Sequence, residues 1–463
     1  MALITTLNTK FISEHIVKPS SPTPNHLRSL RASLFDHINV PILMPLIFFF
    51  YSQKHTTKIG ANDVLDRLKK TLPYALSVFY PLAGRVLDAN SISCNDEGVP
   101  YVQAEVDKPL IDVAYKAEIS QLDKLLPPYG QEGFTALLLA IQVNVFTCGG
   151  LAIGVKMSHA ISDAFSFVMF VKTWASMVAN GNNQYHHNLC GRPCFDIWKL
   201  FPPSTPKFNN FDDCDANQNA DFIKDRPVSK WFIFSEEKLH VLRSKLFPET
   251  NTSTSPNRAR VPSLPMVLSA FVWSRIKLSC YNSVNSIPYE VYHAVNLRPR
   301  VSPPDDQSYY FGNMVVNAII KLCTTINDKN ISNCQRHFLN QMNESIGKVN
   351  NDEFIREMQE GKEDLKFITQ HFERESKGDI VALGFSNLRS LRVYEADFGW
   401  GKPIWVTSAT LMFKNLVIFI PAGPSSNNIV AYINLNSEDM AKLENDKEFT
   451  VLVSKAPHAT SKL

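Results

Sequence analysis

Large apolar side chains alternate with other residues in one segment of the chain, and they occupy the odd positions: Leu151, Ile153, Val155 and Met157. Side chains alternate between the two faces of a strand, so residues 151–157 are predicted to form a β-strand with a buried face. Residues 135–146 form a second apolar segment, and the paired glycines within 147–150 suit a tight turn. We therefore expect a β-hairpin here.

Helical spacing of apolar residues governs other segments. It predicts helices over 62–72, 165–180, 236–246 and 262–277. Asn62 and Ser235 have the polar side chains that cap helix starts, and Gly181 suits a helix end. Strands are predicted at 416–420 and 429–435, followed by a helix capped by Ser437. The apolar run 40–51 is too short to cross a bilayer and contains two prolines, so we interpret it as a buried strand.

Strands mixed with helices in both halves indicate a layered α/β architecture. A chain of 463 residues is longer than one hydrophobic core usually serves, so two domains are expected. Residues 181–226 are rich in Asn, Asp and Pro and have little periodicity. The predicted organisation is an N-terminal domain over 1–185, a crossover over 186–226 and a C-terminal domain over 227–463.

Composition narrows the classes of partner. The formal net charge is +3 and no basic stripe with interleaved aromatics occurs, so nucleic acid is not an expected partner. Residues 1–10 lack the pattern of a secretion signal, and the eight cysteines are therefore expected to be free thiols in a reducing cytosol. The Asn-x-Ser triplets at Asn251, Asn330 and Asn343 are then chance matches. These features are typical of a cytoplasmic, soluble enzyme.

Two kinds of ligand site find little support. His186, His187, Cys190 and Cys194 are zinc-ligand types, but their spacing matches no zinc finger, so no metal is expected. Neither standard glycine-rich phosphate-binding loop is present.

His159 follows the predicted strand 151–157 and continues its buried face where the strand ends. A reactive group at that boundary could meet a substrate and still be held rigidly, but a structural core histidine fits the pattern too. Asp163 could orient the His159 ring or simply cap the following helix. Residues 397–401 form a short loop with an acid, two glycines and two aromatics, which alone indicates a tight turn with a buried tryptophan.

Together, residues 159–163 and 397–401 resemble the HxxxD and DFGWG signatures of the plant BAHD acyltransferases. The second signature consists of Asp397, Phe398, Gly399, Trp400 and Gly401. Further segments agree along nearly the whole chain: 18–24, 80–85, 146–150, 296–300 and 311–313. The resemblance is closest to the branch that includes vinorine synthase, capsaicin-synthase-like and acylsugar-forming enzymes.

This resemblance implies two similar-sized domains, each like chloramphenicol acetyltransferase, with a solvent channel between them and a short segment around 375–400 packed on the N-terminal domain. It implies a monomer without metal or permanently bound cofactor, which takes acyl-CoA as co-substrate and a small alcohol as acceptor. His159 would lie in the channel as general base, since a hydroxyl is too weakly acidic to attack a thioester unaided. A serine or cysteine nucleophile is not needed.

The resemblance also implies that Asp163 is a structural residue paired with an arginine, although a role in orienting His159 stays open. Asp397 is expected to pair with Arg298. Two departures from the family pattern occur: Ala164 replaces a frequent glycine, and residues 386–394 lack a frequent tryptophan. Alternatives are an amine acceptor, a hydrolase that activates water, and a non-catalytic relative that acts as a binding protein.

Overall fold

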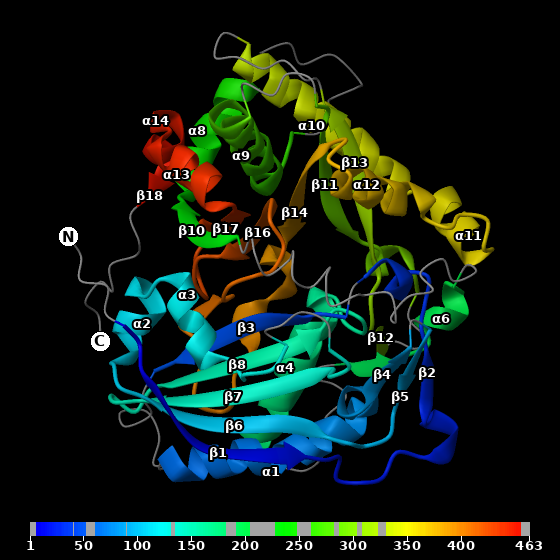
Figure 1. Ribbon diagram of the computed structural model, residues 1–463, viewed down its shortest axis with the longest axis vertical. Coiled ribbons are helices and arrows are strands. Elements are labelled where there is room, and N and C mark those ends of the chain that lie inside the picture. Colours follow the sequence, from blue (N-terminus) through cyan, green and yellow to red (C-terminus); the bar gives the residue numbers. More distant parts are fainter. Residues whose placement is uncertain are drawn as a thin grey trace.

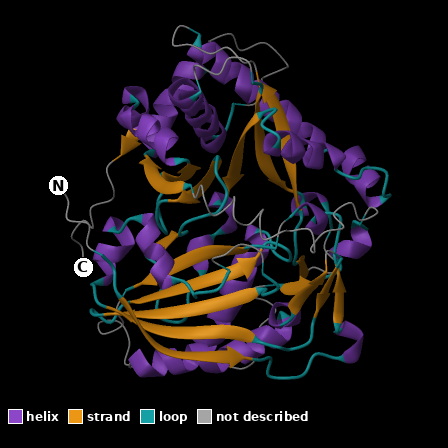
Figure 2. Cartoon of the chain, viewed as in Figure 1, coloured by secondary structure: helices purple, strands orange, loops and turns teal. Residues whose placement is uncertain are grey.

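The computed structural model describes the chain in eleven segments: residues 6–39, 41–51, 61–88, 90–130, 135–181, 191–203, 227–247, 261–281, 287–302, 308–322 and 330–454. Two large sheets dominate it, one built mainly from the N-terminal half and one from the C-terminal half (Figure 1). Helices pack on both sheets, so the molecule is a layered α/β structure as predicted (Figure 2). Most of the predicted crossover, 186–190 and 204–226, lies outside the described residues.

The first sheet has six strands in the order β1-β6-β7-β8-β3-β15. Their bounds are Thr9–Val17 for β1, Leu43–Phe50 for β3, Val99–Val106 for β6, Leu139–Phe146 for β7, Leu151–Ser158 for β8 and Trp405–Thr407 for β15. Strands β7 and β8 form the predicted hairpin, and Gly149 in its turn has φ +79°. The apolar run 40–51 supplies β3, which pairs with β8 so that Leu43 lies opposite Ser158.

Helices cover both faces of this sheet. Helices α1 (Ala61–Val78) and α4 (Ala164–Asn180) share an apolar cluster with the odd-numbered residues of β8. Helices α2 (Leu110–Lys116) and α3 (Ile119–Leu122) pack on the opposite face. Helix α4 ends at Gly181, whose φ of +59° is the left-handed conformation expected of a glycine at this position.

The second sheet has seven strands in the order β13-β11-β14-β16-β17-β10-β18. Their bounds are Val228–Phe234 for β10, Tyr289–Asn296 for β11, Val315–Leu322 for β13, Val381–Asn387 for β14, Leu416–Pro421 for β16, Ile429–Leu435 for β17 and Val453–Ser454 for β18. One apolar cluster joins this sheet to five helices: α8 (Glu236–Leu246), α9 (Leu264–Cys280), α10 (Ile331–Val349), α13 (Ser437–Asn445) and α14 (Lys447–Leu452). The predicted helices and strands in this half are confirmed.

One predicted cap in this half is wrong. Ser437 is already the first residue of α13, and Asn436 is the cap, because its side chain accepts a hydrogen bond from Asp439 N at 2.8 Å.

Two further helices of this half, α11 (Asp352–Gln359) and α12 (Lys366–Ser376), pack on an apolar cluster separate from that of the second sheet.

Two small sheets complete the fold, and the second of them joins the two halves. Strands β2 (Ser29–Arg31), β5 (Ser91–Ser93) and β4 (Arg85–Asp88) form a small sheet. Strand β9 (Arg192–Cys194) pairs with β12 (Ser308–Tyr310), and α6 (Ile197–Leu200) follows β9.

The C-terminal half also completes the first sheet. Strand β15 pairs with β3, with Trp405 opposite Phe49. Residues between Leu388 and Leu411 join the apolar core of the first sheet, whereas β14 belongs to the second. The residues that pack on the N-terminal sheet thus overlap the later part of the expected segment 375–400 and extend beyond it to Leu411. The domain boundaries themselves stay a prediction. No helix among the described residues is both long and apolar enough to cross a membrane.

Candidate active site

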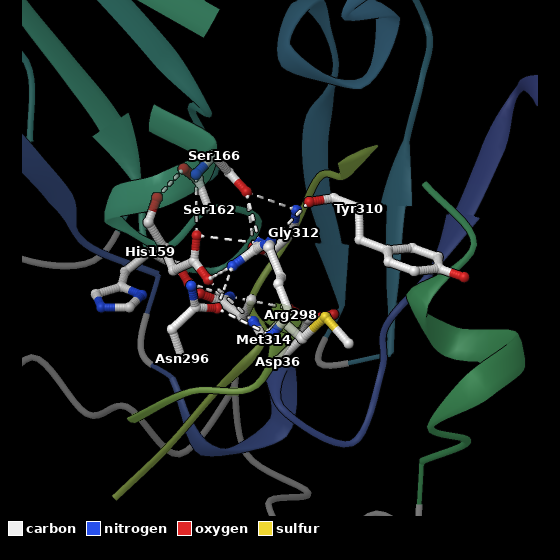
Figure 3. Close-up of polar contacts among 11 residues, drawn as sticks. Asp36, His159, Ser162, Ser166, Asn296, Arg298, Tyr310, Gly312 and Met314 are labelled. Atoms are coloured by element: carbon white, nitrogen blue, oxygen red, sulfur yellow. Dashed lines mark hydrogen bonds and ion pairs between the residues drawn. The ribbon is translucent and has the colours of Figure 1, made fainter. Parts of the chain in front are cut away.

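His159 directly follows β8, where the ladder between β3 and β8 ends. Its N–H donates to Ile42 O at 2.9 Å, and its carbonyl accepts from Asn313 Nδ2 at 2.7 Å. The residue is half-buried, and within the described part of the chain its buried Nδ1 has no hydrogen-bond partner. The imidazole points away from the polar contacts around Arg298 (Figure 3). The backbone is thus held on both sides while the ring is left without a protein partner at Nδ1.

Asp163 is the N-cap of α4 and is buried. Its Oδ1 accepts from Ser166 N at 3.0 Å, and its Oδ2 accepts from Met314 N at 3.1 Å. Arg298 binds the same carboxylate through Nη1 at 2.7 Å and through Nη2 at 3.2 Å. The carboxylate is therefore engaged by two backbone N–H groups and a bidentate guanidinium, which is the structural role implied by the resemblance.

Arg298 begins a 3-10 helix, η6 (Arg298–Arg300), directly after β11. Beyond its pair with Asp163, its Nε donates to Tyr310 O at 2.9 Å and its Nη2 donates to Gly312 O at 2.9 Å. Its guanidinium also lies over the Phe165 ring, with 4.5 Å between Cζ and the ring centroid. This buried cation therefore joins the loop before β13 to the start of α4.

The side chain of Ser166 also ties the loop before β13 to the start of α4 (Figure 3). Ser166 Oγ donates to Gly312 O and accepts from Gly312 N, both at 2.9 Å. Gly312 has φ +144°, and a Cβ built there would lie 2.7 Å from Ile197 Cδ1. A side chain at this position would strain the backbone, so the close approach depends on glycine.

The expected pair between Asp397 and Arg298 is wrong. Asp397 Oδ1 accepts from Gly399 N at 2.8 Å and from Gly401 N at 2.9 Å, within its own loop. Gly399 lies against Ala179 at the C-terminal end of α4, whereas Arg298 binds the N-terminal end. A helix of 17 residues is about 25 Å long, so the two signatures lie at opposite ends of α4.

The aromatic residues of the second signature are arranged differently from the expectation. Phe398 is the buried ring, and Trp400 is only half-buried. Their rings stack with centroids 5.5 Å apart, and Phe398 also makes an edge contact with Trp174 of α4 at 5.2 Å. Residues 397–401 therefore form a turn that packs against α4, away from His159.

Sequence reasoning missed the residues that hold the His159 loop from a distance. Asn313 belongs to segment 311–313, which resembles the family, but no role was predicted for it. Asp36 and Ser166 were not predicted as site residues. Burial raises the pKa of the Asp36 carboxyl above its ordinary value, and hydrogen bonds from Ser33 and Asn313 oppose that change.

Metal binding has little basis in the described residues. Among them, no group of three or more His, Cys, Asp or Glu side chains could hold a metal ion. His186, His187 and Cys190 lie outside the described residues.

The chain is similar to proteins of known activity over nearly its whole length. A profile of the transferase family matches residues 7–450. Stemmadenine O-acetyltransferase of Catharanthus roseus is 30% identical over 448 residues, which cover 94% of this chain and 96% of the relative. The chain belongs to the BAHD transferase family.

Solved structures agree with this assignment. Vinorine synthase, a BAHD relative at 26% identity, superposes with a TM-score of 0.76 over 97% of this chain and 99% of its own. The F. graminearum TRI101 protein, solved with coenzyme A and deoxynivalenol, has a TM-score of 0.65 at 15% identity and covers 92% of this chain and 99% of its own, which supports the fold alone. The predicted fold class, α/β with two domains like chloramphenicol acetyltransferase, is confirmed. The chain is an acyltransferase, as predicted.

Proposed function

We propose that the chain is an acyl-CoA-dependent O-acyltransferase that esterifies a hydroxyl of a plant specialised metabolite, with an alkaloid- or sugar-type acceptor. The relationship to stemmadenine O-acetyltransferase supports the reaction type. Acyl-CoA as the donor is supported by the TRI101 protein, whose structure contains coenzyme A in the same fold.

The single observation that carries the mechanism is the environment of His159. Its backbone is fixed by Ile42 and Asn313, while its buried Nδ1 has no hydrogen-bond partner among the described residues. A neutral imidazole held in this way is suited to take a proton from an acceptor hydroxyl as the oxygen attacks the thioester carbon. The new C–O bond forms, the C–S bond breaks, and CoA leaves as a thiolate that receives the proton from His159.

Asp163 has a positioning role in this proposal and does not handle protons. In a catalytic triad the acid accepts a hydrogen bond from the imidazole. Here the Asp163 carboxylate is bound by Arg298, Ser166 and Met314. Asp163 therefore holds the start of α4, and with it the end of the His159 loop.

The test replaces His159 by glutamine. Loss of the base should lower kcat by about 10²–10⁴-fold, while the protein stays folded and its Kd for acetyl-CoA stays near that of the wild type. The assay incubates the enzyme with short- and branched-chain acyl-CoAs and a plant metabolite extract, and measures CoA release with a thiol reagent and new esters by mass spectrometry. His240→Gln on the surface of α8 is the matched control.

Near-normal turnover by His159→Gln would refute the base assignment. Release of CoA without acceptor, and without a new ester, would support a hydrolase instead. A new amide in place of an ester would identify an amine acceptor, and the absence of any CoA release or acylated product with the wild type would favour a non-catalytic relative.

A further inference from the structure

Asp36 lies in the first turn of a 3-10 helix, η2 (Asp36–Ile38), which precedes β3. Its Oδ2 accepts from Ser33 N at 2.7 Å and from Ser33 Oγ at 2.8 Å. Its Oδ1 faces away from that turn and accepts from Asn313 Nδ2 at 2.8 Å. The partners of this carboxylate are all donors, which suits its ionised form.

Asn313 is buried, and its amide group bridges two acceptors. One Nδ2–H reaches Asp36 Oδ1, and the other reaches His159 O at 2.7 Å. Since a carboxylate oxygen and a carbonyl oxygen both require a donor, this network settles which end of the amide is nitrogen. Asn313 Oδ1 is buried without a hydrogen-bond partner among the described residues. The Asn313 amide thus donates to both Asp36 and His159, although buried polar atoms such as its own oxygen normally have a hydrogen-bond partner too.

The same bridge completes the fixation of the His159 backbone. Its N–H is bonded to Ile42 O, from the segment that links Asp36 to β3. Its carbonyl is bonded to Asn313, whose orientation Asp36 fixes. Both bonds therefore depend on the N-terminal half, one directly on Ile42 and one on Asp36 through Asn313 from the C-terminal half.

We propose that Asp36 is a positioning residue for His159 and that it acts through the amide of Asn313. The proposal rests on the proposed function, in which His159 is the base. Asp36 does not touch the reacting atoms; it orients the donor that holds the His159 carbonyl. The imidazole follows its backbone, and a displacement of about 1 Å at a reacting group costs on the order of 10²-fold in rate.

An exchange of the two residues separates positioning from folding. In Asp36→Asn, the new side chain keeps its oxygen toward Ser33 and turns an NH₂ group toward the NH₂ of Asn313, so two donors meet. In Asn313→Asp, two carboxylates face each other, and His159 O loses its donor. The double variant restores a donor–acceptor pair between positions 36 and 313 but leaves the His159 carbonyl opposite a carboxylate.

The matched control is Asp446→Asn in the C-terminal half. Asp446 is also a buried carboxylate with its own partners, Arg275 at 2.6 Å and Ser279 at 2.6 Å. Its loss should lower Tm without changing the kcat of the folded enzyme. This variant therefore reports what destabilisation alone does to turnover.

We expect both single variants to lower Tm and to lower kcat by about 10–100-fold, with KM for the acyl-CoA and the acceptor within about threefold of the wild type. The double variant should regain most of the Tm but not the kcat. Recovery of kcat along with Tm would overturn the proposal, as would a rise in KM with kcat unchanged.

A spectroscopic measurement keeps the test independent of turnover. With histidines labelled at ¹³Cε1, the His159 resonance is the one absent from His159→Gln. It should shift or broaden in Asn313→Asp and in the double variant, and stay in place in Asp446→Asn. An unchanged His159 resonance in folded Asn313→Asp would refute the positioning role. Absence of acyl transfer by the wild type would refute only the proposed function.

Discussion

Arg298 is the residue on which most contacts around the HxxxD segment converge. Its guanidinium is almost fully buried, with a side-chain exposure of 8%, and binds Asp163 together with the carbonyls of Tyr310 and Gly312. A buried cation is tolerated only when it is paired and hydrogen-bonded. Removal of Asp163 would leave this cation without its counter-charge.

Asp163→Asn should therefore lower the free energy of unfolding by about 3–5 kcal/mol. Asp397→Asn should cost less, because Asp397 accepts only from the N–H groups of its own loop. Urea denaturation measures two double-mutant cycles. The first combines Asp163→Asn with Arg298→Met, and the second combines Asp397→Asn with Arg298→Met. We expect a coupling energy above about 0.5 kcal/mol between Asp163 and Arg298, and additive effects for Asp397 and Arg298. Coupling in the second cycle alone would contradict the observed pairing.

At this scale, strand parity in the sequence placed His159 at the end of a buried strand, and the structure has it there. The partner of Arg298 could not be found in this way, because Asp163 and Asp397 are both acids next to a predicted helix or turn. The spacing of Ser33 and Asp36 resembles a local capping pattern. The hydrogen bond between Asp36 and Asn313, which lie 277 residues apart, depends on the tertiary fold and is not visible in the sequence.

At the scale of elements, helix α4 connects the two family signatures. Asp163 caps its start, and the turn over 397–401 packs against its end. Gly399 and Gly401 both have positive φ, +96° and +109°. Their surroundings differ: a Cβ on Gly399 would lie 2.8 Å from Ala179 Cα, whereas a Cβ on Gly401 would have nothing within 4 Å.

These two glycines form a matched pair for substitution by alanine. Gly401→Ala adds only backbone strain, on the order of 1–2 kcal/mol. Gly399→Ala adds the same strain and also pushes the turn away from α4, so its Tm should fall further. Differential scanning fluorimetry of both variants measures the difference. Equal losses in Tm would show that the close approach to Ala179 contributes nothing to stability.

Helix α4 and the hairpin of β7 and β8 were predicted from the sequence, because the periodicity of the one and the glycine punctuation of the other are clear. Strands β11, β13 and β14 were not predicted. Polar residues such as Glu290 interrupt their apolar pattern. Their places are set by pairing in the sheet, antiparallel between β11 and β13 and parallel between β11 and β14, which sequence spacing does not report. Asn436 and Ser437 are adjacent, and both residue types can cap a helix. Asn436 is the cap of α13 because its backbone is extended, whereas Ser437 is already helical.

At the scale of the whole molecule, the N-terminal half does not complete its own core, whereas the second sheet and its helices form a core from C-terminal residues alone. Strand β15 from the C-terminal half forms the edge of the first sheet beside β3, and residues between Leu388 and Leu411 fill its apolar core. A second cluster joins Phe35 and Phe201 to Leu297 and Met314. His159 is itself bonded to Ile42 from one half and to Asn313 from the other, so the site also depends on both halves.

This interlocking predicts how the chain behaves when it is divided after residue 203. Fragment 1–203 alone exposes the edge of β3, which is apolar from Leu46 to Phe50, and it lacks Asn313 and Arg298. Exposed apolar edge strands pair with other chains, so this fragment should aggregate. Co-expressed with fragment 204–463, it should instead co-purify as a 1:1 complex and regain acyl transfer, because β15 covers the edge. Size-exclusion chromatography with a tag on one fragment measures the assembly. A soluble, monomeric and cooperatively unfolding fragment 1–203 would show that β15 is dispensable, and the N-terminal half would then be an independent folding unit.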